Sequence, residues 1–178
     1  NVGTLNVTAK AENKNYKDVT VDYTLKVTRK AVTVTADNKS KVFGEKDPEL
    51  TATVTGTIGK DTVEYTLSRK AGEDVGTYTI TPSGKAEQTN YKVTYATGTL
   101  TITKAETMTL TPELTGKDAE KEYDSKPLSG GATASVTKGT KITYSTDGGK
   151  TWSETLPSIT NVGTLNVTAK AENKNYKD

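Results

Sequence analysis

Hydrophobic and polar residues alternate one by one along several short stretches of this chain. Such alternation is typical of a β-strand with one packed face and one face in solvent. Glycine, asparagine, aspartate and proline separate the stretches at the roughly 8–12-residue spacing of small all-β domains. No window of helical length keeps an apolar period of about 3.6 residues. The predicted strands include Leu25–Val27, Val32–Ala36, Leu50–Val54, Tyr78–Ile80, Leu100–Ile102, Ile142–Tyr144 and Leu165–Val167.

Threonine strengthens this interpretation, because 36 of the 178 residues are threonine. Its branched side chain is stiff and suits the solvent face of a sheet. Hydrophobic residues make up only 31%, below the roughly 45–50% of a single compact globule. A net charge of +2 and regular apolar spacing argue against disorder. We therefore predict an all-β chain of tandem small modules, each an Ig-like or Greek-key β-sandwich.

An internal repeat organises the chain. Residues 1–18 and residues 161–178 are the same string, NVGTLNVTAKAENKNYKD, placed 160 residues apart. A repeat of this kind marks an array of structural modules. We expect the fragment to hold one full period and the beginning of the next.

A weaker repeat lies inside the period. Residues 11–30 align without gaps with residues 86–105, and Val2-Gly3-Thr4 matches Val75-Gly76-Thr77. The identical aligned pairs are Ala11/Ala86, Glu12/Glu87, Asn15/Asn90, Tyr16/Tyr91, Thr24/Thr99, Leu25/Leu100 and Thr28/Thr103. We predict C-terminal strands of a preceding module at 1–30, a module A at 31–104, and a module B at 105–178 that lacks its last strand.

The missing strand of module B has its sequence at Val19 to Arg29. A module without that strand leaves a sheet edge unpaired. We therefore expect head-to-tail strand complementation between copies of the chain in crystals. The other expected partners are the neighbouring repeat modules of the same chain.

Residue usage argues against an enzyme. Cysteine and histidine are absent, which removes disulfides, thiol nucleophiles, the commonest metal ligand and the usual general base. No cofactor or metal site is predicted, because the aspartates are scattered over turns. Twenty-four basic and 22 acidic residues give no electrostatic case for nucleic acid. No apolar run predicts membrane insertion, and we expect any anchor outside these residues.

The segment YSTDGGKTW resembles the Asp-box hairpin of sialidase-type propellers. Its motif residues are Ser145, Asp147, Gly149, Thr151 and Trp152. The aspartate is expected to accept hydrogen bonds from turn amides while the indole packs under the turn. The box is structural even in those enzymes, so no sialidase activity follows. Sugar stacking on an exposed Trp152 is the alternative role.

Residues 31–104 resemble the bacterial MBG domain of the Tyr-Gly type. The resemblance is carried by AVTVTADNKSKVFGEKDPELT, LSRKAGEDVGTYTI and NYKVTYATGTLTITK. Phe43 stands before Gly44, where family members usually have tyrosine. The fold alternative for this module is β-grasp-like. Module B looks like the Ig-like repeats that accompany MBG domains.

Three tyrosines, Tyr16, Tyr91 and Tyr176, each follow an asparagine before the last strand of a module. They resemble corner tyrosines, which pack inward and hydrogen-bond backbone groups; ligand contact is the alternative.

The resemblance implies a large, wall-attached bacterial surface adhesin, and the absence of cysteine is common in such Gram-positive proteins. The leading hypothesis is a stalk or spacer that projects a distal binding domain from the cell surface. The alternative is that the repeats themselves bind host glycan or protein weakly and multivalently.

Overall fold

The computed structural model describes residues 1–112 and 119–177, and these residues form strands, turns and loops without any helix. The prediction of an all-β chain is confirmed, and its several sheets are consistent with β-sandwich modules. The chain divides into two compact units. Unit 1 comprises residues 1–40, 47–72 and 77–101, and unit 2 comprises residues 41–46, 73–76 and 102–178. The predicted module boundaries at 30 and 104 stay a prediction.

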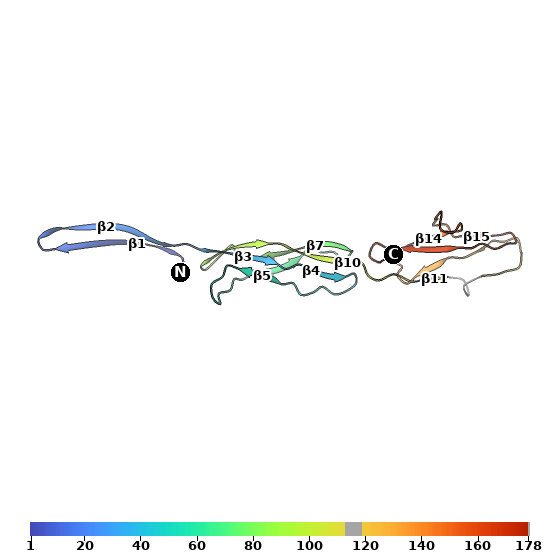
Figure 1. Cartoon of the computed structure of the whole chain (residues 1–178), viewed down its shortest axis with the longest axis horizontal. Helices are drawn as coiled ribbons and strands as arrows, with labels where there is room; N and C mark the ends of the chain where they lie inside the picture. The colour runs from blue at the N-terminus through green and yellow to red at the C-terminus, as the bar shows by residue number, and fades with distance from the viewer. Residues whose placement is uncertain (113–118, 178) are drawn as a thin grey trace. The chain divides into compact units, whose positions relative to one another are not determined.

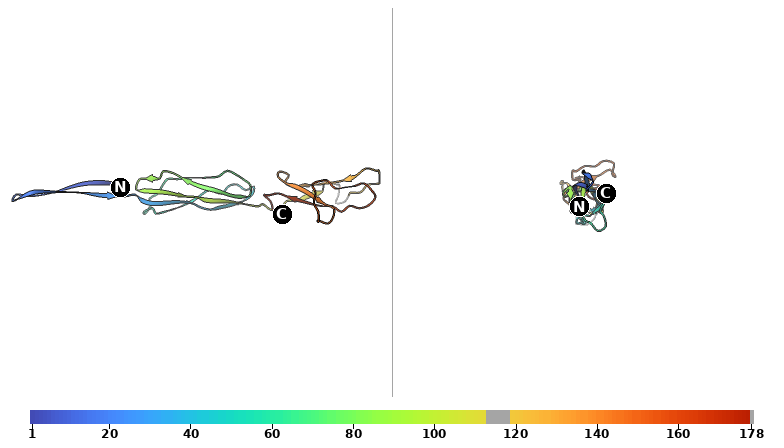
Figure 2. Two further views of the ribbon diagram at one scale, coloured as in Figure 1. Left: turned by 90° about the horizontal axis from the view of Figure 1, so that it is seen from above. Right: turned by 90° about the vertical axis from the view of Figure 1, so that its left-hand side faces the viewer.

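The first part of unit 1 is a long hairpin of β1 (Gly3–Asn13) and β2 (Tyr16–Val27), drawn in blue (Figure 1). Directly paired residues of antiparallel strands point to the same face. The pairs Leu5 with Leu25 and Val7 with Tyr23 therefore make one face apolar, whereas Thr8 with Asp22 belongs to the polar face. Figure 1 and the left-hand view of Figure 2 show no second layer of strands on the hairpin among the described residues.

Residues 30–103 contain eight strands in two four-stranded sheets. One sheet has the order β5-β3-β9-β8, and the other has the order β4-β10-β7-β6. Strand β3 runs parallel to β9, with Lys30 opposite Tyr91 and Thr35 opposite Ala96. The strands are β3 (Lys30–Ala36), β4 (Lys39–Val42), β5 (Ala52–Thr55), β6 (Thr66–Arg69), β7 (Gly76–Ser83), β8 (Glu87–Gln88), β9 (Tyr91–Ala96) and β10 (Gly98–Thr103).

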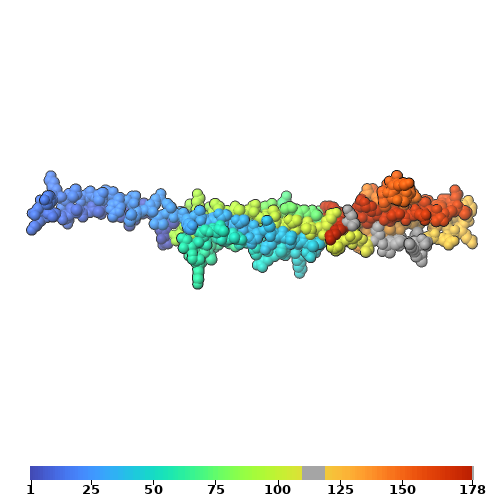
Figure 3. All heavy atoms as spheres, in the orientation of Figure 1, coloured from blue at the N-terminus to red at the C-terminus, as the bar shows by residue number. Residues whose placement is uncertain are grey.

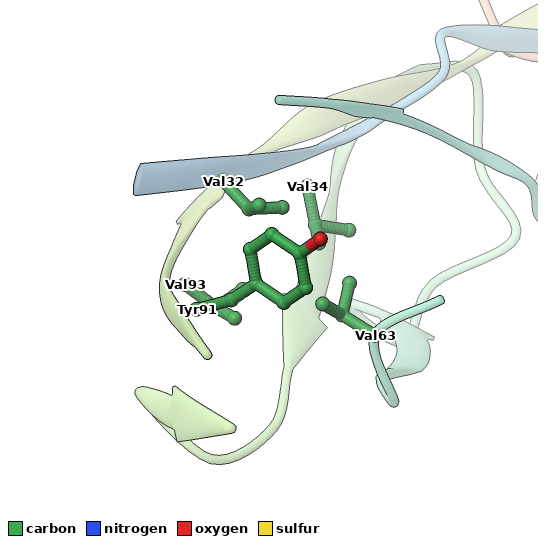
Figure 4. Close-up of a cluster of buried hydrophobic side chains, with 5 residues drawn as sticks. All are labelled: Val32, Val34, Val63, Tyr91 and Val93. Atoms are coloured by element: carbon green, nitrogen blue, oxygen red, sulfur yellow. The ribbon is translucent and has the colours of Figure 1, made fainter. Parts of the chain in front are cut away.

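The core of unit 1 follows the alternation of the sequence. Val32 and Val34 of β3 are fully buried, while the threonines between and after them face outward. Tyr91, Val93 and Val63 complete the cluster around these valines (Figure 4). On the other sheet, Ile80 and Leu100 are fully buried. The set of buried apolar side chains is small, as the low hydrophobic content predicts.

Unit 2 contains shorter strands in three two-stranded sheets, with the orders β11-β13, β12-β15 and β14-β16. Its buried apolar side chains among the described residues are fewer, and include Ala132, Ala134 and Tyr144. The strands are β11 (Leu110–Pro112), β12 (Leu128–Ser129), β13 (Ala132–Ala134), β14 (Lys141–Ser145), β15 (Ser158–Ile159) and β16 (Thr168–Glu172).

The two copies of the 18-residue repeat differ in structure. The first copy forms a strand over Gly3–Asn13, whereas the second is a strand only over Thr168–Glu172. The predicted strand Leu165–Val167 is therefore wrong. Its equivalents Leu5 and Val7 pair with β2, and residues 165–167 have no such partner among the described strands. Strand structure here depends on the neighbour and not on local sequence.

Candidate functional site

The Asp-box-like segment forms a compact loop after β14. The Asp147 carboxylate accepts hydrogen bonds from the backbone N–H groups of Lys150 and Thr151, both at 2.9 Å. It also accepts the hydroxyl protons of Thr151 at 2.6 Å and Ser145 at 2.7 Å. These bonds, from Thr151 first, hold the pKa of Asp147 well below its usual value. The segment thus closes on the carboxylate, and Ser145 is buried beneath it.

Trp152 belongs to the same loop. Its indole Nε1 donates to the Gly149 carbonyl at 3.1 Å, and backbone bonds between Tyr144 and Ser153 close the loop base at 2.7 and 2.9 Å. Gly148 and Gly149 have φ angles of 73° and 86°, in the left-handed region that favours glycine. The indole remains 41% exposed. The structure therefore brings all five motif residues together in a turn whose polar groups bind one another.

The three aligned tyrosines have different surroundings. Tyr91 is buried, donates its hydroxyl proton to Asp61 at 2.6 Å, and accepts a hydrogen bond from the Ile58 N–H at 3.1 Å. The bond to Asp61 raises the pKa of Tyr91. Tyr176 is half-buried. Tyr16 is 78% exposed, contrary to the expected inward packing, because none of the described strands packs over the β1–β2 hairpin.

Phe43 and Gly44 lie in the turn after β4. The Glu45 N–H donates to the Val42 carbonyl at 3.1 Å, and Gly44 has a φ of 88°. These features describe a β-turn that requires a left-handed residue at its third position. The Phe43 ring meets the Tyr176 ring edge-on, with centroids 5.6 Å apart and planes at 70°. The phenyl ring therefore packs against an aromatic partner without needing a hydroxyl.

Asn90 holds two separate backbone segments in unit 1. Its side-chain Oδ1 accepts a hydrogen bond from the Val2 N–H at 3.0 Å. Its backbone carbonyl accepts another from the N–H of Lys30, the first residue of β3, at 2.9 Å. Arg29, which directly precedes Lys30, forms an ion pair with Glu87 at 3.2 Å. The residue therefore ties the end of the hairpin to the first strand that follows it.

Asn175 makes the same pair of bonds in unit 2. Its Oδ1 accepts from the Val75 N–H at 2.9 Å, and its backbone carbonyl accepts from the Ala105 N–H at 2.9 Å. Ala105 also bridges to Tyr176 in parallel, as Lys30 does to Tyr91. Val2 and Val75, which the alignment relates to each other, thus make the same kind of bond, each to its own asparagine.

Asp74 adds an electrostatic component to the bonds at Asn175. Its carboxylate accepts hydrogen bonds from Lys174 at 2.7 Å and from the Asn175 amide at 2.9 Å. These contacts, from Lys174 first, lower the pKa of Asp74. The Asn175 side chain is thus both donor and acceptor, and only 7% of the residue is exposed.

Sequence reasoning did not select these asparagines, although Asn15 and Asn90 are an identical pair in the alignment. It selected the adjacent tyrosines, because a large ring gives a clearer burial signal than an amide. The joint recurrence of Val-Gly-Thr and Asn-Tyr was the signal available. The contact between Val75 and Asn175 joins residues 100 positions apart, and it is visible only in the structure.

Neither a candidate metal cluster nor a membrane-spanning helix occurs among the described residues. Among them, no group of three or more histidine, cysteine, aspartate or glutamate residues could hold a metal ion. No helix long and apolar enough to cross a membrane occurs in residues 1–112 and 119–177. A groove of about 1450 Å³ in unit 2 is lined in part by apolar side chains.

Comparison with known proteins identifies a domain within residues 30–103. No curated protein and no solved structure matches the chain. A known domain family does match it, over residues 32–101, and this confirms the resemblance predicted for residues 31–104. The Ig-like character of residues 105–178 stays a prediction. Residues 32–101 match the MBG domain family, YGX type.

Proposed function

We propose that this chain is a spacer segment of a large bacterial surface adhesin, where its repeats project a distal binding domain away from the cell. The MBG domain is a repeat associated with surface adhesins and is a structural domain type. The spacer role is our proposal, and so are the extracellular location on a Gram-positive bacterium and anchoring to the cell wall. On this proposal the chain is not an enzyme.

The bonds at Asn90 and Asn175 carry the proposal. Each asparagine accepts a hydrogen bond from a valine N–H with its side chain, Val2 at Asn90 and Val75 at Asn175. Its backbone carbonyl accepts another, from Lys30 at Asn90 and from Ala105 at Asn175. A flexible linker would need no such bonds, since its purpose is free movement. A spacer that transmits distance needs joints that resist bending. Two similar bonded joints within one period are what a length-adding array requires.

Small-angle X-ray scattering on the full chain tests this proposal. We expect the wild-type chain to scatter as a stiff particle, and the double variant N90A/N175A to give a broader distribution of internal distances. The matched control is Asn15→Ala, because Asn15 is the repeat equivalent of Asn175 and is exposed on the hairpin. A wild-type profile as flexible as that of the double variant would contradict the spacer proposal.

Location and binding need separate measurements. On intact cells of the source bacterium, an antibody against residues 31–104 should label the surface without permeabilisation. Labelling that appears only after permeabilisation would contradict the extracellular location. Saturable binding of the full chain to mucin or another host glycan would favour the alternative, in which the repeats themselves are the adhesive elements.

A further inference from the structure

Unit 2 carries a loop that residues 30–103 lack. The Asp-box loop, residues 145–156, begins at the end of β14. Strand β6 pairs with β7 as β14 pairs with β16, but only five residues lie between the end of β6 and Val75 of the Val-Gly-Thr segment. Sixteen residues lie between the end of β14 and the equivalent Val162. The strand pairing forms without the longer connection, so the loop is an addition to the fold, and loops of this kind often carry function.

The loop lies on the edge of β14 that faces away from β16. Both backbone groups of Tyr144 bond to Ser153, at 2.7 and 2.9 Å, while Tyr144 pairs with Ala169 of β16 on its other side. Residues 146–156 are all exposed. Figure 3 draws this segment in orange, and it stands out from the surface of unit 2. The loop is therefore open to a ligand from solvent.

Trp152 is held in a fixed position on this loop. Its Nε1 donates to the Gly149 carbonyl at 3.1 Å, and a Cβ added at Gly149 would lie 3.6 Å from the indole Cζ2. The indole therefore contacts the loop on one side, and 41% of the residue is in solvent. An aromatic ring that is already fixed loses little conformational entropy when a ligand binds to it.

The chemistry of the exposed indole restricts the kind of ligand. Because Nε1 already donates to Gly149, the ring offers its apolar surface and no further hydrogen bond. Such a surface can bind a cation, an apolar protein surface or the C–H face of a sugar ring. Lys150 in the same loop is positively charged and exposed, which disfavours a cation.

Size distinguishes between the two remaining ligands. A stable protein interface covers about 800 Å² on each partner. The loop has only two large exposed apolar side chains among its described residues, Trp152 and Leu156, and this is too little for the core of such an interface. A single sugar ring matches the area of one indole. Its hydroxyl groups require polar partners, and the loop offers Lys150 as a donor and Glu154, which pairs with Lys141 at 2.6 Å, as an acceptor.

We propose that the Asp-box loop is a glycan-binding site, in which the C–H face of a pyranose ring stacks on Trp152 while Lys150 and Glu154 bind its hydroxyl groups. A single contact of this kind is weak, with a dissociation constant on the order of millimolar. Several such loops along an array would bind a glycan-rich surface together and more tightly. The site goes beyond the spacer role and does not depend on it, because the loop lies outside the bonds at Asn90 and Asn175.

Fluorescence titration of the full chain tests the site directly, because Trp152 is the single tryptophan. The probe is methyl β-D-galactopyranoside, which carries neighbouring C–H groups on one face of its ring. We expect a saturable change in emission, with half-saturation on the order of millimolar. Sorbitol, which has hydroxyl groups but no ring, should cause no saturable change. The absence of a saturable change with the galactoside, or an equal change with sorbitol, would overturn the proposal.

Saturation-transfer NMR, which observes the same galactoside, extends the test to variants of the full chain. W152A should abolish the transfer to the sugar ring. K150A leaves the indole in place and should lower the affinity several-fold, so the test does not depend on how W152A folds. The matched control is Y123A, which removes an aromatic side chain that is 63% exposed in unit 2 but outside the loop, and it should bind like the wild type. Wild-type transfer in W152A, wild-type affinity in K150A, or lost transfer in Y123A would each contradict the proposal.

Discussion

Leu100 and Leu25 offer a direct test of how burial, and not sequence, determines stability in this chain. The two leucines are aligned in the weak repeat, but Leu100 is 0% exposed and Leu25 is 55% exposed. Changing leucine to alanine removes three carbons, which is about 2.4 kcal/mol of transfer free energy at about 0.8 kcal/mol per carbon. The cavity left in a packed core adds to this, so L100A should cost about 2–5 kcal/mol. L25A should cost about 1 kcal/mol or less, because half of that side chain is already in water.

Differential scanning calorimetry on the full chain measures both variants. For a domain of this size, about 1 kcal/mol shifts the melting temperature by roughly 4–8 °C. The transition of the MBG domain should therefore fall by about 8 °C or more in L100A. Equal shifts in L100A and L25A would refute the burial argument.

Three further changes test individual contacts. Y91F should lower the urea midpoint of unfolding, because it removes a hydroxyl with two partners, whereas Y16F at the exposed aligned tyrosine should not change it. D147N should remove a pH dependence of the free energy of unfolding. Hydrogen bonds lower the pKa of Asp147. The stability that they provide is therefore present above the ordinary aspartate pKa of about 4 and is lost as the pH falls below it. Acid titration followed by the fluorescence of the single tryptophan should show this loss in the wild type, and a wild-type response identical to that of D147N would contradict it. G98A should cost about 1–3 kcal/mol, because a new Cβ would lie 2.4 Å from the Ala36 carbonyl oxygen. G3A, with no atom within 4 Å of the new Cβ, should change stability by less than about 0.5 kcal/mol in chemical denaturation; equal effects would exclude the steric explanation.

The all-β fold was predictable because alternation reports directly on which side chains enter a core. Val32 and Val34 are buried and Thr35 between Val34 and Ala36 is exposed, as a half-buried strand requires. The hydrogen-bonded Asp147 loop was also predictable, since all of its partners lie within a few residues. Local chemistry was sufficient for both.

Features that depend on distant partners were not predictable in the same way. Tyr16 and Tyr91 occupy aligned positions but differ in burial, since only Tyr91 has a layer packed over it. The side chain of Asn175 is in a turn, where asparagine has several local roles. Its bond to Val75 requires the chain to return after 100 residues. The residues of such contacts can be read from the sequence, but which distant residues come into contact cannot.

The parallel pairing of β3 with β9 has a mechanical consequence. The polypeptide enters the MBG domain at the start of β3, and it leaves through β10, which follows β9 directly. Because the two paired strands point the same way, tension on the chain pulls them in opposite directions along their length. All the hydrogen bonds between the Lys30–Tyr91 pair and the Thr35–Ala96 pair then bear the load in shear at the same time, and they do not break one after another.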